Sequence, residues 1–133
     1  MSTTIAPADD LRTLLGDNAV LTDPERMAGY LREPRKRFNR TALAVALPAD
    51  VAQVQALVRW AAERRIGLVP QGGNTGLVGA QVPARGDEIV VSLARLNLIR
   101  SLDAEAGNMV AEAGVILEEA HRAAEAAGAI FPL

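Results

Sequence analysis

The sequence predicts an α+β fold: a small sheet that carries a parallel strand–helix–strand unit, together with a β-hairpin and covering helices. Three observations lead to this prediction. The continuous apolar run Ala42–Leu47, closed by Pro48, has the length of a strand buried on both faces. Apolar residues then recur at helical spacing from Asp50 to Arg65, and a second short strand begins at Leu68-Val69-Pro70. Later, two apolar runs flank Ala106-Gly107-Asn108, which is typical of a hairpin turn.

The first forty residues are expected to form two short helices and a loop. One helix is indicated by leucines at helical spacing before a glycine that can end it: Leu11, Leu14, Leu15 and Gly16. A second helix start lies at Thr22-Asp23-Pro24, because proline suits the first helical turn. The following segment, Arg32–Arg40, holds five basic residues against Glu33. It either contacts a phosphate or acidic substrate, or is a solvated loop.

The strand–helix–strand unit has marked helix ends. Asp50 is expected to cap the helix, with Gln53 completing a capping-box-like pair, and Gly67 is expected to stop it. Ile89–Leu93 is predicted to be a third strand. The crossover is expected to be right-handed.

The last part of the chain predicts a hairpin and a helix. The hairpin strands are expected at Leu98–Glu105 and Met109–Ala113, and the alanine-rich helix at Ile116–Ala127, with Gly128 as its stop. The chain then closes on the apolar residues Ile130–Leu133. We expect this end to be a bared edge through which copies of the chain can self-associate.

Composition excludes several classes of site. The 133 residues include no cysteine and one histidine, His121, so disulfides, thiolate sites and multi-imidazole zinc sites are excluded. The net charge of -2 argues against a general nucleic-acid binder.

No stretch approaches the roughly 20 apolar residues that span a bilayer. Residues 1–10 lack a signal-peptide pattern, so a soluble, reducing, cytoplasmic location is expected.

The segment that carries chemistry is the glycine-rich stretch from Pro70 to Gln81, PQGGNTGLVGAQ. It follows a strand and places four glycines within eight positions. Glycines allow positive φ angles and leave no Cβ in the way of a ligand, so successive amides can converge on a phosphate. Asn74 and Thr75 can add side-chain donors. With no Lys or Arg between Pro70 and Pro83, backbone dipoles would hold the anion. The alternative is a flexible surface turn.

Two familiar phosphate loops do not fit this stretch. A P-loop needs Lys followed by Ser or Thr after its last glycine, whereas Leu77-Val78 follows Gly76. A dinucleotide fingerprint of the Rossmann type needs glycines at the first, third and sixth positions, opening into a helix. Here Gly73, Gly76 and Gly79 recur every third residue and lead into a poor helix start.

At these residues the sequence resembles the FAD-linked oxidases of the vanillyl-alcohol-oxidase superfamily, with their PCMH-type FAD-binding domain. The closest resemblance is to the D-2-hydroxyglutarate dehydrogenases, beside the D-lactate dehydrogenase and glycolate oxidase group. Gln71–Gly79 match the family's pyrophosphate loop nearly without departure. Further landmarks stand in family order, among them Ala113-Gly114-Val115 and Phe131-Pro132-Leu133. The resemblance implies that residues 1–133 are the N-terminal portion of an FAD domain, without the rest of that domain or a substrate domain.

The resemblance also implies the site residues. The expected FAD contacts are Pro70, Gln71, Gly72, Gly73, Asn74, Thr75, Gly76, Leu77, Gly79, Ala80, Gln81, Pro132 and Leu133. No catalytic or metal-binding residue is expected in this chain. Some relatives attach FAD through a histidine directly after the paired glycines; Asn74 stands there, which implies non-covalent FAD.

The implied reaction is oxidation of a small D-2-hydroxy acid, of the hydroxyglutarate, lactate or glycolate type, to its 2-oxo acid. The cofactor would carry the redox chemistry, and this portion alone is expected to be inactive and to hold FAD weakly. One alternative keeps the flavin-binding fold but changes the chemistry, as in related reductases and transferases. The other alternative is a free-standing module that binds another phosphate ligand or a partner without catalysis.

Overall fold

The computed structural model describes residues 7–38 and 40–133. These residues contain four α-helices, one 3-10 helix and six strands. In chain order they are α1 Pro7–Leu15, η1 Asp17–Ala19, β1 Val20–Leu21, α2 Pro24–Met27, β2 Ala44–Ala46, α3 Val51–Arg64, β3 Leu68–Gln71, β4 Ile89–Ser92, β5 Ile99–Asp103, β6 Asn108–Ala111 and α4 Leu117–Ala126. Residues 1–6, which belong to the stretch where no signal-peptide pattern is predicted, lie outside the described residues. The α+β class is confirmed.

The strands form two separate sheets. The larger has the order β1-β2-β4-β3, with β2, β4 and β3 mutually parallel and β1 antiparallel at the edge. The parallel unit is therefore confirmed, but its two strands β2 and β3 are separated by β4. The expectation of only helices and loop in the first forty residues is wrong, because Val20 and Leu21 pair with Ala46 and Val45. A two-residue strand has too short a repeat for its sequence to predict it.

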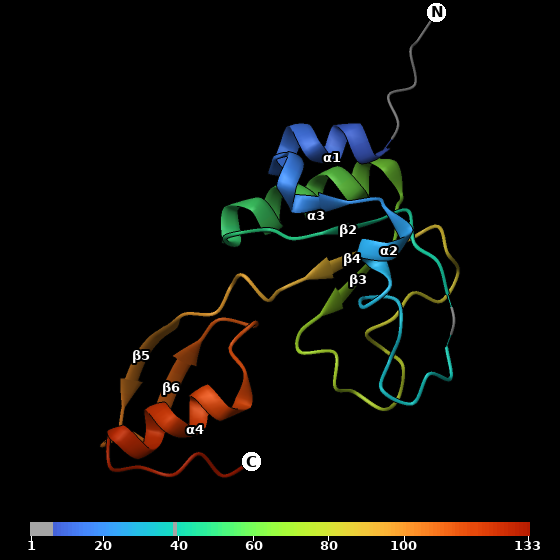
Figure 1. Cartoon of the computed structure of the whole chain (residues 1–133). Helices are drawn as coiled ribbons and strands as arrows, with labels where there is room; N and C mark the ends of the chain where they lie inside the picture. The colour runs from blue at the N-terminus through green and yellow to red at the C-terminus, as the bar shows by residue number, and fades with distance from the viewer. Residues whose placement is uncertain (1–6, 39) are drawn as a thin grey trace, which may run out of the picture.

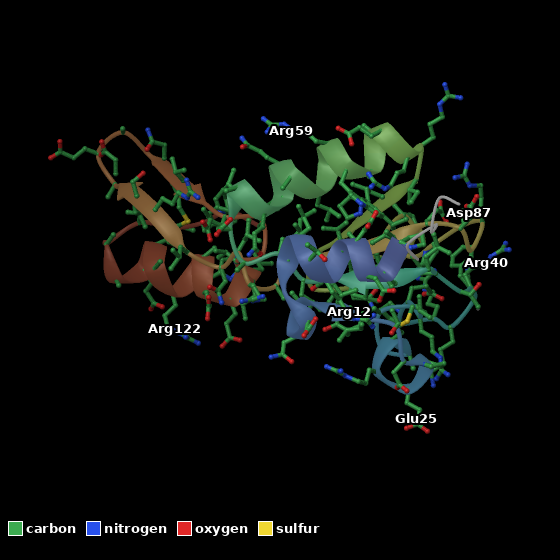
Figure 2. All side chains as sticks on the ribbon, turned by 90° about the horizontal axis from the view of Figure 1, so that it is seen from above. Arg12, Glu25, Arg40, Arg59, Asp87 and Arg122 are labelled. Carbon is green, nitrogen blue, oxygen red and sulfur yellow. The ribbon has the colours of Figure 1, made fainter. Side chains whose placement is uncertain are left out.

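Alternation along the strands divides the core between the two faces of the larger sheet. Ala44, Ala46, Ile89 and Val91 face α1 and α3, which lie side by side over the sheet (Figure 2). Val45 and its neighbours face the other side, where α2 and the chain that follows it provide the cover. Figure 1 shows both layers, with the hairpin β5–β6 and α4 forming a second lobe that is joined to the sheet through residues 93–98. α4 thus covers the hairpin and not the larger sheet.

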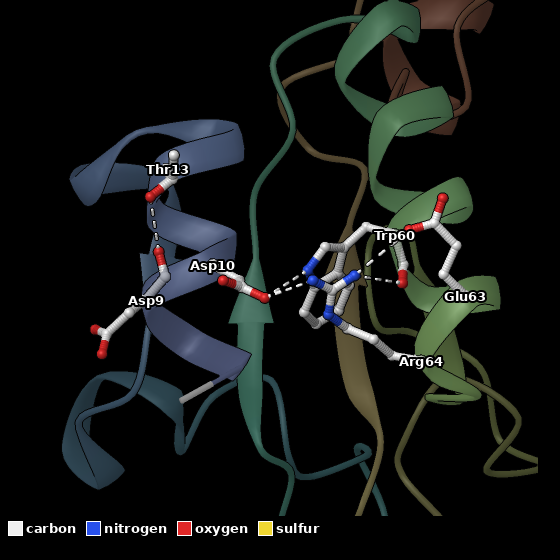
Figure 3. A network of polar contacts seen from close by, with 6 residues as sticks. All are labelled: Asp9, Asp10, Thr13, Trp60, Glu63 and Arg64. Atoms are coloured by element: carbon white, nitrogen blue, oxygen red, sulfur yellow. Dashed lines mark hydrogen bonds and ion pairs between the residues drawn. The ribbon is translucent and has the colours of Figure 1, made fainter. Parts of the chain in front are cut away.

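Polar side chains fix the position of α1 on α3. The Asp10 carboxylate accepts from Arg64 Nη2 at 2.7 Å and from Trp60 Nε1 at 3.3 Å (Figure 3). The Arg64 guanidinium also lies 4.9 Å from the centroid of the Trp60 ring. Since Asp10 and Arg64 are far apart in sequence, this contact joins two helices that carry much of the core.

Helix ends follow the local signals with one exception. Asp50 Oδ1 accepts from the Gln53 amide at 2.8 Å, and Gln53 Oε1 accepts from the Ala49 amide at 2.7 Å, so the capping pair is confirmed. Asp23 caps α2 in the same way, through the Arg26 amide. The prediction that Gly67 stops α3 is wrong, because the left-handed residue is Arg65, with φ +54°. Gly67 instead allows the Glu88 side chain to approach closely.

Candidate functional site

The glycine-rich loop, residues 72–81, leaves the larger sheet at the end of β3. Its first anchor is Gln71, which is buried. Gln71 Nε2 donates to the Tyr30 carbonyl at 2.8 Å and to the Gln81 carbonyl at 2.9 Å. This one side-chain amide therefore joins the two ends of the loop to the chain after α2, and both of its hydrogens are used inside the protein.

Asn74 is the second anchor. Its backbone is left-handed, with φ +55°, a conformation that asparagine tolerates better than most residues. Asn74 Nδ2 donates to the Gly29 carbonyl at 3.0 Å and to the Arg32 carbonyl at 2.7 Å. The expectation that this side chain donates to a bound anion is therefore not met by the structure, which uses both donors elsewhere. Thr75, the other expected side-chain donor, is exposed.

The backbone amides of the loop are available. Within the part of the chain that the structure describes, no carbonyl or side chain accepts from any amide between Gly72 and Gln81. The first amide after the loop, that of Val82, donates to the Gly79 carbonyl at 3.3 Å. An anion-binding loop needs unused main-chain donors, and internal capping of these amides would have excluded that interpretation.

The glycines of the loop fall into two groups. A Cβ at Gly73 would meet nothing within 4 Å, and one at Gly72 would lie 3.8 Å from the Ala113 carbonyl. The later glycines instead pack against the protein itself. A Cβ at Gly76 would crowd Gln81, whose Nε2 donates to the Gly76 carbonyl at 2.6 Å. Gly79, with φ +80°, is the glycine of this loop that takes a positive φ.

The part of the basic segment that spans residues 32–38 lies directly against the loop, which the sequence did not predict. The Arg32 carbonyl holds Asn74, and the Phe38 ring covers Gly79 where a Cβ would be. In the described residues, the salt bridges of the chain involve other arginines, so no basic side chain of this segment forms a salt bridge. Figure 2 shows Arg40 at the same end of the molecule as Asp87, and Arg122 at the opposite end. Because the basic segment and the glycine-rich loop are far apart in sequence, no local sequence pattern could predict that they pack together.

Glu33 is the acid within this basic segment, and it is only 2% exposed. Its carboxylate accepts from the Arg35 amide at 2.6 Å and from the Arg37 amide. Burial raises the pKa of Glu33, but hydrogen bonds from the amides of Arg37, Arg35 and Phe38 outweigh it, so the net pKa is lowered. The expected solvated loop is thus folded around an ionised internal carboxylate.

The Ala113–Val115 turn lies beside the start of the loop. Gly114 donates its amide to the Leu96 carbonyl at 2.8 Å, and a Cβ at Gly114 would overlap the Leu93 and Leu96 carbonyls. The turn therefore depends on a residue without a side chain. Together with the contact between Gly72 and Ala113, this places the end of β6 next to the open half of the loop.

The two expected C-terminal contacts lie in the second lobe. Pro132 borders an apolar pocket with the hairpin turn and α4, whose lining includes Leu102, Met109 and Phe131. The Leu133 carbonyl lies 2.7 Å from Nε2 of the exposed His121. Among the described residues, neither Pro132 nor Leu133 forms a hydrogen bond with residues 72–81.

The described residues hold neither a cluster of metal-binding side chains nor a membrane-spanning helix. Over residues 7–38 and 40–133, no group of three or more His, Asp or Glu side chains is arranged to hold a metal ion. No helix in the same residues has the length and apolar character needed to cross a membrane.

Comparison with known proteins identifies the family. The D-2-hydroxyglutarate dehydrogenase of Xanthomonas citri pv. viticola is 41% identical over 84% of the chain and 24% of its own length. That of Stutzerimonas stutzeri is 37% identical over 94% of the chain and 27% of its own length. The chain thus spans about a quarter of these relatives. The fold resembles p-cresol methylhydroxylase, with a TM-score of 0.78 and 24% identity over 91% of this chain and 24% of that one. The FAD binding domain family matches residues 42–133, well over half of the sequence, and the protein belongs to that family.

Proposed function

We propose that this chain is the FAD-binding part of a flavin-dependent oxidoreductase that converts a D-2-hydroxy acid to its 2-oxo acid. Within it, the loop of residues 72–81 holds the FAD pyrophosphate through main-chain amides. The single observation that carries the proposal is the set of unused amides between Gly72 and Gln81. They belong to a chain whose family binds FAD.

The geometry of the loop fits a diphosphate in three respects. The amides of its first half stand where Gly72 and Gly73 leave open space, so a phosphate oxygen can approach the backbone. The second half is fixed by Gln81 and Phe38, so the loop is held before a ligand arrives. The loop contains no cation, so its backbone dipoles are the attractive groups that it contributes itself.

The residues of this chain bind and orient the cofactor. When bound, FAD supplies the capacity to accept two electrons from the substrate. Gln71 and Asn74 keep the loop in register with the sheet and with the chain after α2. No residue here is assigned to proton transfer, and we expect the chain alone to be inactive and to bind FAD more weakly than micromolar.

The substrate class rests on the relatives. Those described above are named as D-2-hydroxyglutarate dehydrogenases, and a putative D-lactate dehydrogenase of Schizosaccharomyces pombe is 34% identical over 84% of this chain and 21% of its own length. Both names denote 2-hydroxy acids, so the shared class is proposed and not one acid. Cytoplasmic location and self-association through Ile130–Leu133 stay predictions; sedimentation tests the second.

An NMR titration of the ¹⁵N-labelled chain tests the cofactor site. FAD and ADP are expected to shift the amides of Gly72, Gly73, Thr75 and Gly76, whereas riboflavin, which has no phosphate, is expected to leave them in place. An equal shift with inorganic pyrophosphate alone, which has no nucleoside, would favour the alternative, a general phosphate-binding module. Loop amides that stay fixed at millimolar FAD would contradict the proposed site.

The variant Gly73→Ala sharpens this test. A Cβ at position 73 meets no protein atom and strains no positive φ, so the variant should keep the unfolding midpoint of the wild type. The same Cβ stands in the open half of the loop, so FAD affinity should fall several-fold.

Because Asn74 replaces the histidine of covalent relatives, acid precipitation of the wild-type chain should release all bound FAD into the supernatant.

A further inference from the structure

We propose that Glu33 is a positioning residue for the glycine-rich loop: its buried carboxylate shapes residues 32–38, and this segment in turn fixes Asn74 and Gly79. The inference rests on the proposed function of the loop for its effect on FAD, but its structural part is independent of any ligand. It assigns a cofactor-related role to a side chain that lies about forty residues before the loop.

The first step is the fold of the segment around the carboxylate. Oε2 of Glu33 accepts from the Arg35 amide, and Oε1 from the Arg37 amide. The Glu33 carbonyl accepts from the Lys36 amide at 2.9 Å, and Lys36 itself is left-handed, with φ +52°. Two alternate amides, those of Arg35 and Arg37, therefore converge on one anion that the chain supplies to itself.

The second step is the contact between this segment and the loop. The Arg32 carbonyl, next to Glu33, accepts from Asn74 Nδ2 at 2.7 Å. Phe38, at the other end of the turn, covers Gly79. Asn74 and Gly79 are the two residues of the loop with positive φ, so the segment braces the loop where its backbone conformation is least common.

The third step is the charge. Apart from residues 32–40, the chain has nine Lys and Arg against fifteen Asp and Glu, while this segment has five Lys and Arg against one Glu. The cations of the segment repel one another. The positive charge of Arg37 attracts the Glu33 carboxylate and helps to lower its pKa. The ionised Glu33 carboxylate accepts hydrogen bonds from two amides of the segment, and its negative charge offsets part of this repulsion.

Glu33→Gln tests the inference, with Glu118→Gln as the matched control, because Glu118 is an exposed carboxylate of the second lobe. Glutamine keeps the shape but presents an NH₂ group to one of two amides that both need an acceptor. In the ligand-free protein, the amide resonances of Phe38, Asn74 and Gly79 should shift and trypsin should cleave after Arg35–Arg37 several-fold faster. FAD affinity should fall several-fold, while the control matches the wild type.

A pH titration separates this role from a general loss of stability. In the wild type, the amides of Phe38 and Gly79 should titrate together at acid pH, and in Glu33→Gln this common step should be absent. If the ligand-free loop resonances of Glu33→Gln match those of the wild type, the inference is overturned, whatever happens to FAD. If they move but the wild-type loop does not respond to FAD, the proposed function fails and the positioning role stands.

Discussion

The Phe38 ring occupies the space that a side chain at Gly79 would need. The two residues belong to segments that are separated by strand β2, helix α3 and strand β3, so their contact closes the basic segment onto the glycine-rich loop. In the second half of the loop Gly76 and Gly79 thus pack against other side chains, while a Cβ at Gly73 in the first half would meet nothing within 4 Å.

Gly79→Ala is expected to destabilise the loop. The φ of +80° costs a residue with a Cβ about 1 kcal/mol, and the overlap with Phe38 adds an overpacking cost of about 1–3 kcal/mol. Urea unfolding followed by circular dichroism should show a lower midpoint. The double variant Phe38→Ala/Gly79→Ala should lose less than the sum of the two single variants, and strict additivity would show that the ring is not the obstacle.

Gly114→Ala is expected to be more damaging than any other single Gly→Ala change described here. Its Cβ would overlap two backbone carbonyls, those of Leu93 and Leu96, which cannot rotate away as a side chain can. We expect a loss larger than that of Gly79→Ala, on the order of 4 kcal/mol or more in the free energy of unfolding, read from the urea midpoint. Gly29→Ala is the control, because its Cβ meets nothing within 4 Å. Equal midpoints for the two variants would refute the packing at Gly114.

Asp10→Ala is expected to loosen α1 from α3. It removes the acceptor of both Trp60 Nε1 and Arg64, but the side chains of Asp10 and Arg64 are 22% and 39% exposed, so solvent screens the pair. The expected loss is about 0.5–1 kcal/mol, with greater acrylamide quenching of Trp60, the one tryptophan of the chain. Asp9→Ala, which removes a more exposed carboxylate from the same turn, should leave Trp60 quenching unchanged.

Glu112 should make the stability of the hairpin depend on pH. Hydrogen bonds from the Arg100 guanidinium, and then from the Leu98 amide, lower the pKa of Glu112 below its ordinary value of 4.5. A lowered folded-state pKa means that the stabilisation is complete above the ordinary value and is lost as the pH falls through the folded one. Glu112→Gln should therefore lower the urea midpoint at pH 7, and this difference from the wild type should shrink progressively as the pH is lowered below 4.5. Glu105→Gln, an exposed change in the same hairpin, should have no effect at any pH in this range.

The sequence alone determined what depends on neighbours along the chain. Capping by Asp23 and Asp50 depends only on a side-chain acceptor that stands three residues before the amide it binds. The apolar runs that contain Ala44–Ala46 and Ile89–Val91 likewise predict strands that are buried on both faces. The motif of residues 70–81 identified the cofactor family for the same reason, since its four glycines lie within eight positions of one another in sequence.

Tertiary structure decided which distant segments meet. The insertion of β4 between β2 and β3, the pairing of Val20–Leu21 at the sheet edge, and the docking of residues 32–38 on the loop all depend on contacts that no local pattern encodes. The end of α3 also depends on packing. Arg65 takes the left-handed conformation there, and the missing side chain of Gly67 leaves room for the Glu88 side chain. Backbone propensity is a weak energy, and packing of the whole chain overrides it wherever the two disagree.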